Sequence, residues 1–340
     1  MRDLKHIPHW NALSEASRLN IFNAVAANKG TSPEAVEKDW WLVLTLDLIF
    51  QMDCAQALVF KGGTSLSKGW GLIQRFSEDI DLALDREFLG FQGELGKNQI
   101  TKLRKESVAY AMEVFSPQLQ QAFDNLGMEG VKVDPLVPKD SDHDPLKIDI
   151  YVPKLRTPDP YLRPELQVEI GARSLREPFS EIAIHSFVAE EFQGSPFADQ
   201  PLTIPVVNPE RTFLEKILLL HEEHQRPEEK RRVDRLSRHF YDIYQLWGAG
   251  MFEKAFSEET LFETIVAHRQ RYSKVKGVDY SKHSPGNISF LPPDSMLDAW
   301  ESDYQMMQES MIYGEKPSFT HMLEVLVQLQ TQINNITWKQ

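Results

Sequence analysis

The sequence has 340 residues, of which 41% are hydrophobic and 26% are charged, an ordinary composition for a globular protein. Its formal net charge of −13 argues against a general polyanion binder, because nonspecific affinity for nucleic acid comes from neutralising phosphates. The single cysteine, Cys54, excludes an internal disulfide framework, and no apolar run has the length of a membrane span or a signal-peptide core. These features predict a cytoplasmic protein.

The first 85 residues predict helices followed by two short strands. Apolar residues recur at helical spacing over 10–30, and a second helix is expected to begin at Ser32-Pro33, where serine can cap and proline suits the first turn. An apolar strand at 57–61 is stopped by two glycines, a short helix follows, and 79–85 alternates as a strand.

The middle of the chain continues this mixed pattern. Residues 96–127 predict a helix with a broken apolar stripe, and a polar turn is expected at 140–145. Strands are expected at 146–152 and 165–172, with a weaker one at 179–188.

From residue 208 onward the pattern is helical. Helices are expected at 210–223, 232–248, 298–311 and 319–334, with a loop rich in Gly, Pro and Ser over 272–293. Because strands and helices do not alternate regularly, the predicted class is α+β. We expect an N-terminal mixed-sheet domain over 1–207 and a helical domain over 208–340.

A glycine turn joins the first predicted strand to the short helix. Gly62 and Gly63 would let backbone amides approach a ligand, the helix that follows favours an anion, and Thr64 and Ser65 add hydroxyls. The order of a Walker loop is absent, since the lysine, Lys61, precedes the glycines. Taken alone, this pair of glycines is more typical of a simple turn.

Two aspartates follow in the next strand. Asp79 and Asp81 are two residues apart, so a strand would present both carboxylates on one face. Paired carboxylates suit Mg²⁺ bridging to substrate phosphates, whereas two exposed acids on an edge strand would be the simpler interpretation. A phosphate-holding turn and a D-x-D strand within one supersecondary unit together favour a metal-assisted nucleotidyl-transfer site.

This arrangement resembles the polymerase-beta-like nucleotidyltransferase superfamily. KGGTSL and RFSEDIDL are similar to the motifs of the AbiEii/AbiGii toxins, the nucleotidyltransferase component of type IV toxin–antitoxin and abortive-infection (antiviral defence) systems. Further blocks at 165–174, 209–217 and 237–246 resemble later parts of the same family. The resemblance covers nearly the whole chain.

The resemblance implies an NTP substrate, an RNA acceptor (a tRNA 3′ end), and a cognate antitoxin as partner. It implies metal binding by Asp79 and Asp81, a third acid on a neighbouring strand, and nucleotide-site roles for Lys216 and Asp242. The third acid is Glu169 by the family pattern, with Asp149 open, and either could instead pair with Lys147 or Arg173 across strands. Lys61 and Arg173 are weaker phosphate candidates.

Three further points concern a basic stretch, a pair of histidines and the rival functions. Taken alone, the basic stretch 226–238 is better explained as a solvated helix face with local ion pairs, and under the family resemblance it becomes a candidate RNA contact. His221 and His224 lack the spacing of a zinc protease motif. Rival functions are nucleotidylation of a protein hydroxyl and a nonenzymatic module that binds NTP or a partner.

Overall fold

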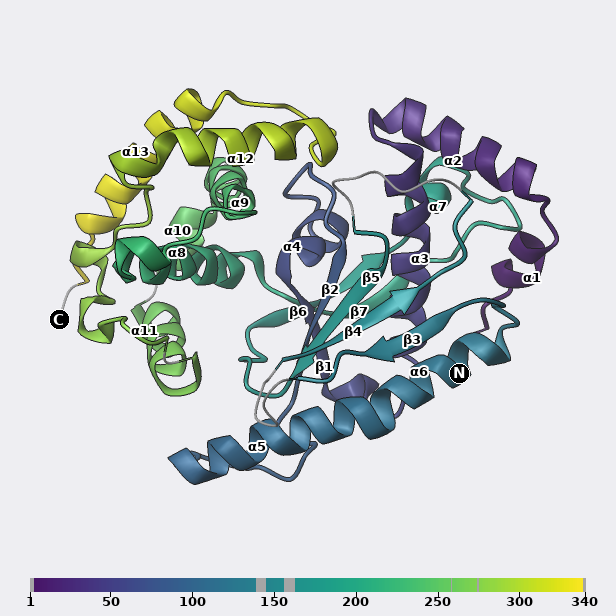
Figure 1. Cartoon of the computed structure of the whole chain (residues 1–340), viewed down its shortest axis with the longest axis horizontal. Coiled ribbons are helices and arrows are strands. Elements are labelled where there is room, and N and C mark those ends of the chain that lie inside the picture. Colours follow the sequence, from purple (N-terminus) through teal and green to yellow (C-terminus); the bar gives the residue numbers. More distant parts are fainter. Residues whose placement is uncertain (1–2, 139–144, 156–162, 258, 274, 339–340) are drawn as a thin grey trace. The chain divides into compact units, whose positions relative to one another are not determined.

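A computed structural model describes residues 3–138, 145–155, 163–257, 259–273 and 275–338, and the turn predicted at 140–145 lies almost wholly outside them. The chain divides into two compact units (Figure 1). The first unit comprises Met1–Trp70 and Phe76–Val207, and the second comprises Gly71–Arg75 and Asn208–Gln340. The second unit therefore includes five residues from the N-terminal part of the sequence.

The first unit opens with three helices. The predicted helix over 10–30 is two helices, α1 (His6–Asn11) and α2 (Glu15–Lys29), because Ser14 caps α2 by accepting a hydrogen bond from the Ser17 amide at 3.1 Å. The next helix, α3 (Pro33–Ile49), begins as predicted, with the Ser32 hydroxyl accepting from Ala35 N. This helix is buried over most of its length, and the ring of Trp40 stacks on Trp10 at 4.5 Å.

A seven-stranded sheet forms the centre of the first unit, in the order β3-β4-β5-β2-β1-β7-β6. Its strands are β1 (Leu58–Lys61), β2 (Asp79–Leu84), β3 (Lys132–Pro135), β4 (Leu146–Tyr151), β5 (Leu166–Gly171), β6 (Phe179–Ile184) and β7 (Leu202–Val207). The pairs β2–β5 and β1–β7 are parallel and the other pairs are antiparallel. This mixed sheet confirms the predicted α+β class.

Two strands had no clear sequence signal. Strand β3 has only four residues and ends in Pro135, while Pro205 interrupts the apolar run of β7. Both strands form because neighbouring strands supply ladder partners, β4 for β3 and β6 for β7.

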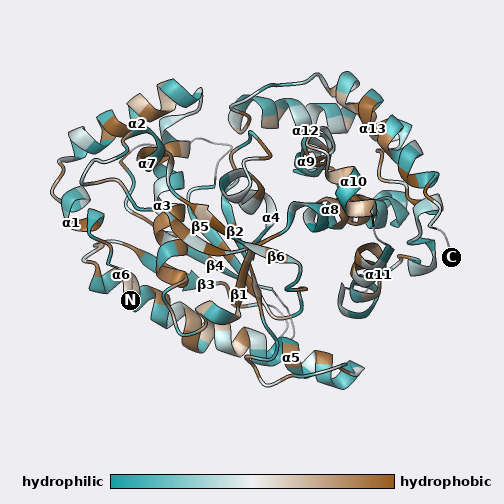
Figure 2. Cartoon of the chain, turned by 180° about the vertical axis from the view of Figure 1, so that it is seen from behind, coloured by the Kyte–Doolittle hydropathy of each residue, from teal (hydrophilic) through white to brown (hydrophobic). Residues whose placement is uncertain are grey.

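One long helical rod runs beside the sheet (Figure 1). It consists of α5 (Lys97–Tyr110), a π-helical turn η3 (Ala111–Phe115) and α6 (Ser116–Asn125). A π-turn adds one residue to the hydrogen-bonded loop and so shifts the phase of the apolar face. This shift explains the broken apolar stripe in the sequence. Strand β1 has the hydrophobic colour (Figure 2), and its Leu58, Val59 and Phe60 are fully buried.

The second unit is built from helices. They are α8 (Pro209–Gln225), α9 (Ser237–Gly248), α10 (Met251–Phe256), α11 (Glu259–His268), α12 (Leu297–Ser310) and α13 (Phe319–Asn334), joined by short 3-10 and π turns. Helices α10 and α11 were not predicted. Helix α9 begins five residues later than the predicted helix at 232, and the chain takes a positive φ of 59° at Arg235 just before it. Within the described part of the chain, no helix is both long and apolar enough to cross a bilayer.

Candidate active site

The glycine turn lies directly against the second aspartate of the D-x-D strand. Gly62 has φ +83°, which favours glycine, and a Cβ atom built on it would lie 1.9 Å from Oδ2 of Asp81. Any side chain at this position would therefore collide with the carboxylate. Antiparallel pairing of β1 with β2 places Lys61 opposite Asp81 in register, so the turn begins beside the acids. Gly62 allows the backbone and the Asp81 carboxylate to share this space.

Hydroxyl groups hold the turn that follows. It consists of a single helical turn, α4 (Gly62–Thr64), continued by a π-turn, η2 (Ser65–Gly69). Thr64 Oγ1 donates to the carbonyl of Asp79 at 2.5 Å, and Ser65 Oγ donates to the carbonyl of Gly62 at 2.9 Å. Thr64 and Ser65 are both buried. The first of these bonds ties the turn to the start of β2, although fifteen residues separate the two.

The acids gather on one face of the central strands. Parallel pairing aligns Asp79 with Gln167 and Asp81 with Glu169, and antiparallel pairing aligns Asp149 with Gln167. Residues in register point to the same face, so Glu169 is the immediate neighbour of Asp81. Asp149 is one strand further away, behind Gln167. The alternate residues Ile80, Leu82 and Leu84 are buried on the opposite face.

Basic side chains contact these acids. Lys147 Nζ lies 2.6 Å from Glu169 Oε1, and Arg163 Nη1 lies 3.4 Å from Asp79 Oδ1. The carboxamide of Gln167 accepts from Arg163 at 2.8 Å and donates to Asp149 Oδ1 at 2.8 Å. Sequence reasoning anticipated the Lys147 pairing but missed Arg163, which lies three residues before the start of β5 and belongs to no motif.

The residue directly before Asp79 is also held by other side chains and backbone groups. Glu78 is buried, and its Oε2 lies 2.7 Å from Lys38 Nζ of α3 and accepts from Arg163 N at 2.7 Å. Near the end of the turn, in η2, Lys68 Nζ lies 2.8 Å from Asp39 Oδ1, also on α3. Burial raises the pKa of Asp39, against the opposing effect of the Lys68 charge. Helix α3 thus supports both halves of the motif.

The donor atoms fit a hard divalent cation. Asp79 and Asp81 offer carboxylate oxygens on one face, and Gly62, which has no Cβ, lets the backbone lie directly against the Asp81 carboxylate. Among the described residues, no group of three or more His, Cys, Asp or Glu side chains is arranged to hold a metal by itself. Two carboxylates suit Mg²⁺, which takes its other ligands from substrate phosphates and water.

Lys216 and Asp242 form a buried ion pair within the second unit. Lys216 Nζ, from α8, lies 2.9 Å from Asp242 Oδ2, from α9, and 3.3 Å from Nδ1 of His239. Arg75 donates to the same carboxylate through Nε and Nη2, each at 2.7 Å. Sequence reasoning missed Arg75, whose only signal was its place four residues before Asp79.

Charge and burial have opposite effects on the pKa values of Asp242 and Lys216. Burial acts to raise the pKa of Asp242, but the charges of Arg75 and Lys216 outweigh it and hold that pKa well below its usual value. Burial lowers the pKa of Lys216, opposed by the Asp242 charge. Burial also holds the pKa of His239 far below its usual value, so this imidazole is neutral beside the lysine.

Much of the basic stretch 226–238 is occupied in local ion pairs. Arg226 and Arg232 both contact Glu223, at 3.0 and 2.7 Å. The predicted helix face over this stretch is wrong, because only a 3-10 turn at Glu228–Lys230 forms before α9 begins at Ser237. His221 and Glu222 belong to a packed cluster with His283 and Arg269, in which Arg269 Nη2 lies 2.6 Å from Glu222.

The α+β fold, the glycine turn and the D-x-D face together define a nucleotidyltransferase. A model of the family described as "Nucleotidyl transferase AbiEii toxin, Type IV TA system" matches residues 47–325, well over half of the chain. The chain therefore belongs to the AbiEii family of nucleotidyltransferase toxins. This confirms the resemblance and the enzyme class, and it implies an NTP substrate and an antitoxin partner.

Solved structures align with this chain at low sequence identity. MenT4, a nucleotidyltransferase toxin from Mycobacterium tuberculosis H37Rv, aligns with a TM-score of 0.50 and 16% identity, covering 96% of this chain and 91% of its own. JHP933 from Helicobacter pylori aligns with a TM-score of 0.41 and 16% identity, covering 89% and 93%. No curated protein matches the sequence.

Proposed function

We propose that this toxin transfers a nucleoside monophosphate from an NTP to an RNA acceptor, a tRNA 3′ end, with Mg²⁺ as the cofactor, and so blocks translation and growth. The observation that carries the donor half is the contact of Gly62 with Asp81, on the same face as Asp79. The turn and the metal-binding acids are neighbours in space as well as in sequence. The triphosphate of the donor would lie between them, along Lys61, Gly62, Gly63, Thr64 and Ser65.

The proposed reaction is an in-line displacement. A cation held by Asp79 and Asp81 would neutralise charge on the α-phosphate and on the leaving group. The acceptor hydroxyl oxygen forms a bond to the α-phosphorus, the bond from the α-phosphorus to the bridging oxygen breaks, and pyrophosphate leaves with the electron pair. Glu169 receives the hydroxyl proton, because it is the carboxylate nearest to Asp81 in the sheet register.

Lys216 is proposed to neutralise triphosphate charge as a point cation, and Asp242 to orient it. The support for this role comes from the family's Glu-Lys helix and Y-D block, and from the 2.9 Å contact inside the second unit. A buried lysine keeps its ammonium beside a carboxylate at an energetic cost that a purely structural apolar pair would avoid.

RNA is favoured over protein as the acceptor by family membership together with the exposed part of the stretch 226–238. Lys230 and Arg232 are exposed there, on an otherwise acidic chain. The internal pairs of Arg226 and Arg232 limit this surface to a few phosphate contacts, so binding should depend weakly on salt.

The test is transfer of label from each α-labelled NTP to separate pools of total RNA and total protein. We expect label on RNA in the tRNA size range, lost in an Asp79→Asn, Asp81→Asn double variant and on removal of divalent metal. Label on protein alone would establish the protein-hydroxyl alternative. A matched control is Asp85→Asn, an aspartate just beyond the far end of β2 that pairs with Arg176 at 3.1 Å.

A further inference from the structure

The segment 71–75 connects the glycine-turn helix to the D-x-D strand, yet it belongs to the second unit. Its backbone is held there: Arg75 forms an antiparallel bridge with Ile312, and the carbonyl of Gln74 accepts from Tyr313 N at 3.1 Å and Gly314 N at 3.3 Å. A Cβ on Gly314 would lie 2.5 Å from the Cβ of Gln74, so this close approach favours glycine. The position of Arg75 is therefore defined by backbone contacts as well as by its side chain.

The side chain of Arg75 binds the carboxylate of Asp242 through two donors. It is 2% exposed, and its two hydrogen bonds of 2.7 Å reach Oδ1 and Oδ2 of Asp242, which is completely buried. A bidentate guanidinium defines the angle as well as the position of its partner, which the point charge of an ammonium does not do. Oδ2 of Asp242 in turn binds Lys216 at 2.9 Å. Arg75 thus binds Asp242, and Asp242 in turn binds Lys216.

We propose that Arg75 is a positioning residue for nucleotidyl transfer, holding the Asp242 carboxylate and, through it, the Lys216 ammonium. This inference rests on the proposed role of Lys216. Only residues 76–78 separate Arg75 from Asp79. The segment that supports the lysine is therefore continuous with the strand that carries the metal ligands.

The charges around the pair give this proposal a pH signature. Asp242 is faced by Arg75, Lys216, His239 and Tyr241, and Lys216 by Asp242, Arg75, His239 and Arg238. The Arg75 charge lowers the pKa of both Asp242 and Lys216. Loss of that charge should raise both pKa values, so Lys216 would stay protonated, and the transfer reaction active, to higher pH.

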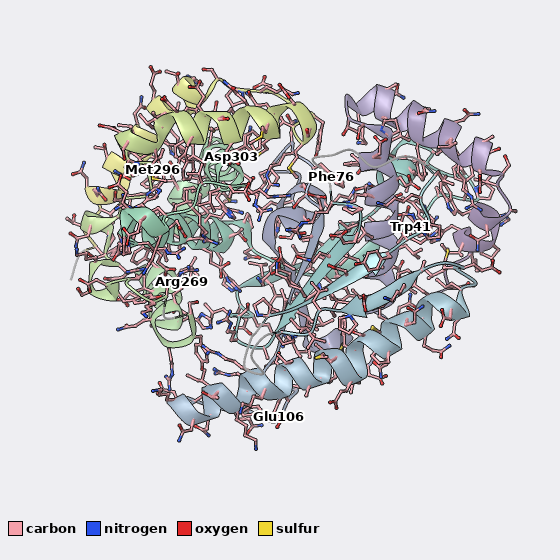
Figure 3. All side chains as sticks on the ribbon, viewed as in Figure 1. Trp41, Phe76, Glu106, Arg269, Met296 and Asp303 are labelled. Carbon is pink, nitrogen blue, oxygen red and sulfur yellow. The ribbon has the colours of Figure 1, made fainter. Side chains whose placement is uncertain are left out.

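The experiment compares Arg75→Lys and Arg75→Gln with Arg269→Lys. Arg269 (labelled in Figure 3) is the matched control, because it makes an equivalent pair with Glu222 at 2.6 and 2.7 Å, six residues beyond Lys216 on α8. Each variant is measured for melting temperature and for the pH dependence of label transfer. Wild type and Asp79→Asn run beside them, so that absence of transfer in wild type would count against the proposed function instead.

We expect Arg269→Lys to lose thermal stability with little change in transfer per folded molecule. Arg75→Lys should retain the wild-type pH profile but transfer about 10-fold more slowly, and Arg75→Gln should lose about 100-fold, with its alkaline limb displaced to higher pH. A profile of Arg75→Gln that superimposes on wild type would overturn the proposal. So would equal activity losses in Arg75→Lys and Arg269→Lys, or failure of both Arg75 variants to fold while Arg269→Lys folds.

Discussion

In the glycine turn, and on the sheet face that carries the acidic side chains, individual residues should tolerate few substitutions. Gly62 must adopt a positive φ and must also leave space for Asp81. Glu169 and Asp149 point to the same face of the sheet but have different neighbours, an ammonium for Glu169 and an amide for Asp149. Because the neighbours of Glu169 and Asp149 differ, conservative substitutions can separate the roles of these two acids.

Replacing Gly62 by alanine should remove transfer and destabilise the fold. The positive φ alone costs about 1–2 kcal/mol for a residue with a Cβ, and the contact at 1.9 Å additionally displaces the Asp81 carboxylate. Urea unfolding and the label-transfer assay measure the two effects. Gly127→Ala is the control, because Gly127 has a φ of +66° with no atom within 4 Å of its added Cβ. Equal transfer by the two variants would contradict the tight approach to Asp81.

The third acid can be identified by comparing Glu169→Gln with Asp149→Asn. We expect Glu169→Gln to reduce the rate of transfer by about 10²-fold or more, since an amide cannot accept the acceptor proton. Asp149→Asn should have little effect, because its carbonyl oxygen can still accept the hydrogen bond from Gln167. Single-turnover rates at saturating NTP give the comparison. The reverse ranking would assign the role to Asp149.

At the scale of secondary structure, distant residues decide where elements begin. The residue that precedes α9, Leu236, offers no capping side chain. Asp303 of α12 (Figure 3) supplies the cap instead, accepting from Arg235 N at 2.7 Å and Ser237 N at 3.0 Å. A local sequence pattern cannot contain a cap from a residue more than sixty positions away, which is why the predicted helix began too early.

Asp303→Ala should therefore destabilise α9 and, with it, the helix that carries Asp242. We expect a loss of about 1–2 kcal/mol in the free energy of unfolding, typical of a lost cap with buried amides left unsatisfied. Asp298→Ala, an exposed aspartate on the same helix, serves as the control and should change stability by less than about 0.5 kcal/mol. Equal losses from the two substitutions would show that Asp303 does not act as a cap.

For the whole molecule, buried histidines predict a dependence of stability on pH. Burial lowers the pKa of His221 and of His224 to about 4. The unfolded chain, with ordinary pKa values near 6.5, binds protons first as the pH falls, so stability should decline between about pH 6.5 and 4. Each histidine should contribute at most about 2–3 kcal/mol to this decline.

Chemical unfolding at pH 7, 5.5 and 4.5 measures this effect. A His221→Gln, His224→Gln variant should show a flatter pH dependence than wild type, whereas His9→Gln, at an exposed position, should not. Below about pH 4.5 a second loss is expected. Burial opposes ionisation of Glu222 and Glu223, but their arginine partners hold both pKa values below the usual range. A wild-type stability that stays constant from pH 7 to 4.5 would contradict the assignment.

The sequence by itself determined the mixed α+β class, the two-part motif and its family, because turn glycines, alternating acids and helical periodicity are local patterns. It could not determine strands β3 and β7, whose formation depends on ladder partners, or the start of α9, which depends on Asp303. It also could not show that Arg75, part of the D-x-D motif by sequence, lies in the helical unit and binds Asp242. Only the tertiary structure decided these points, since each is a contact between residues far apart in the chain.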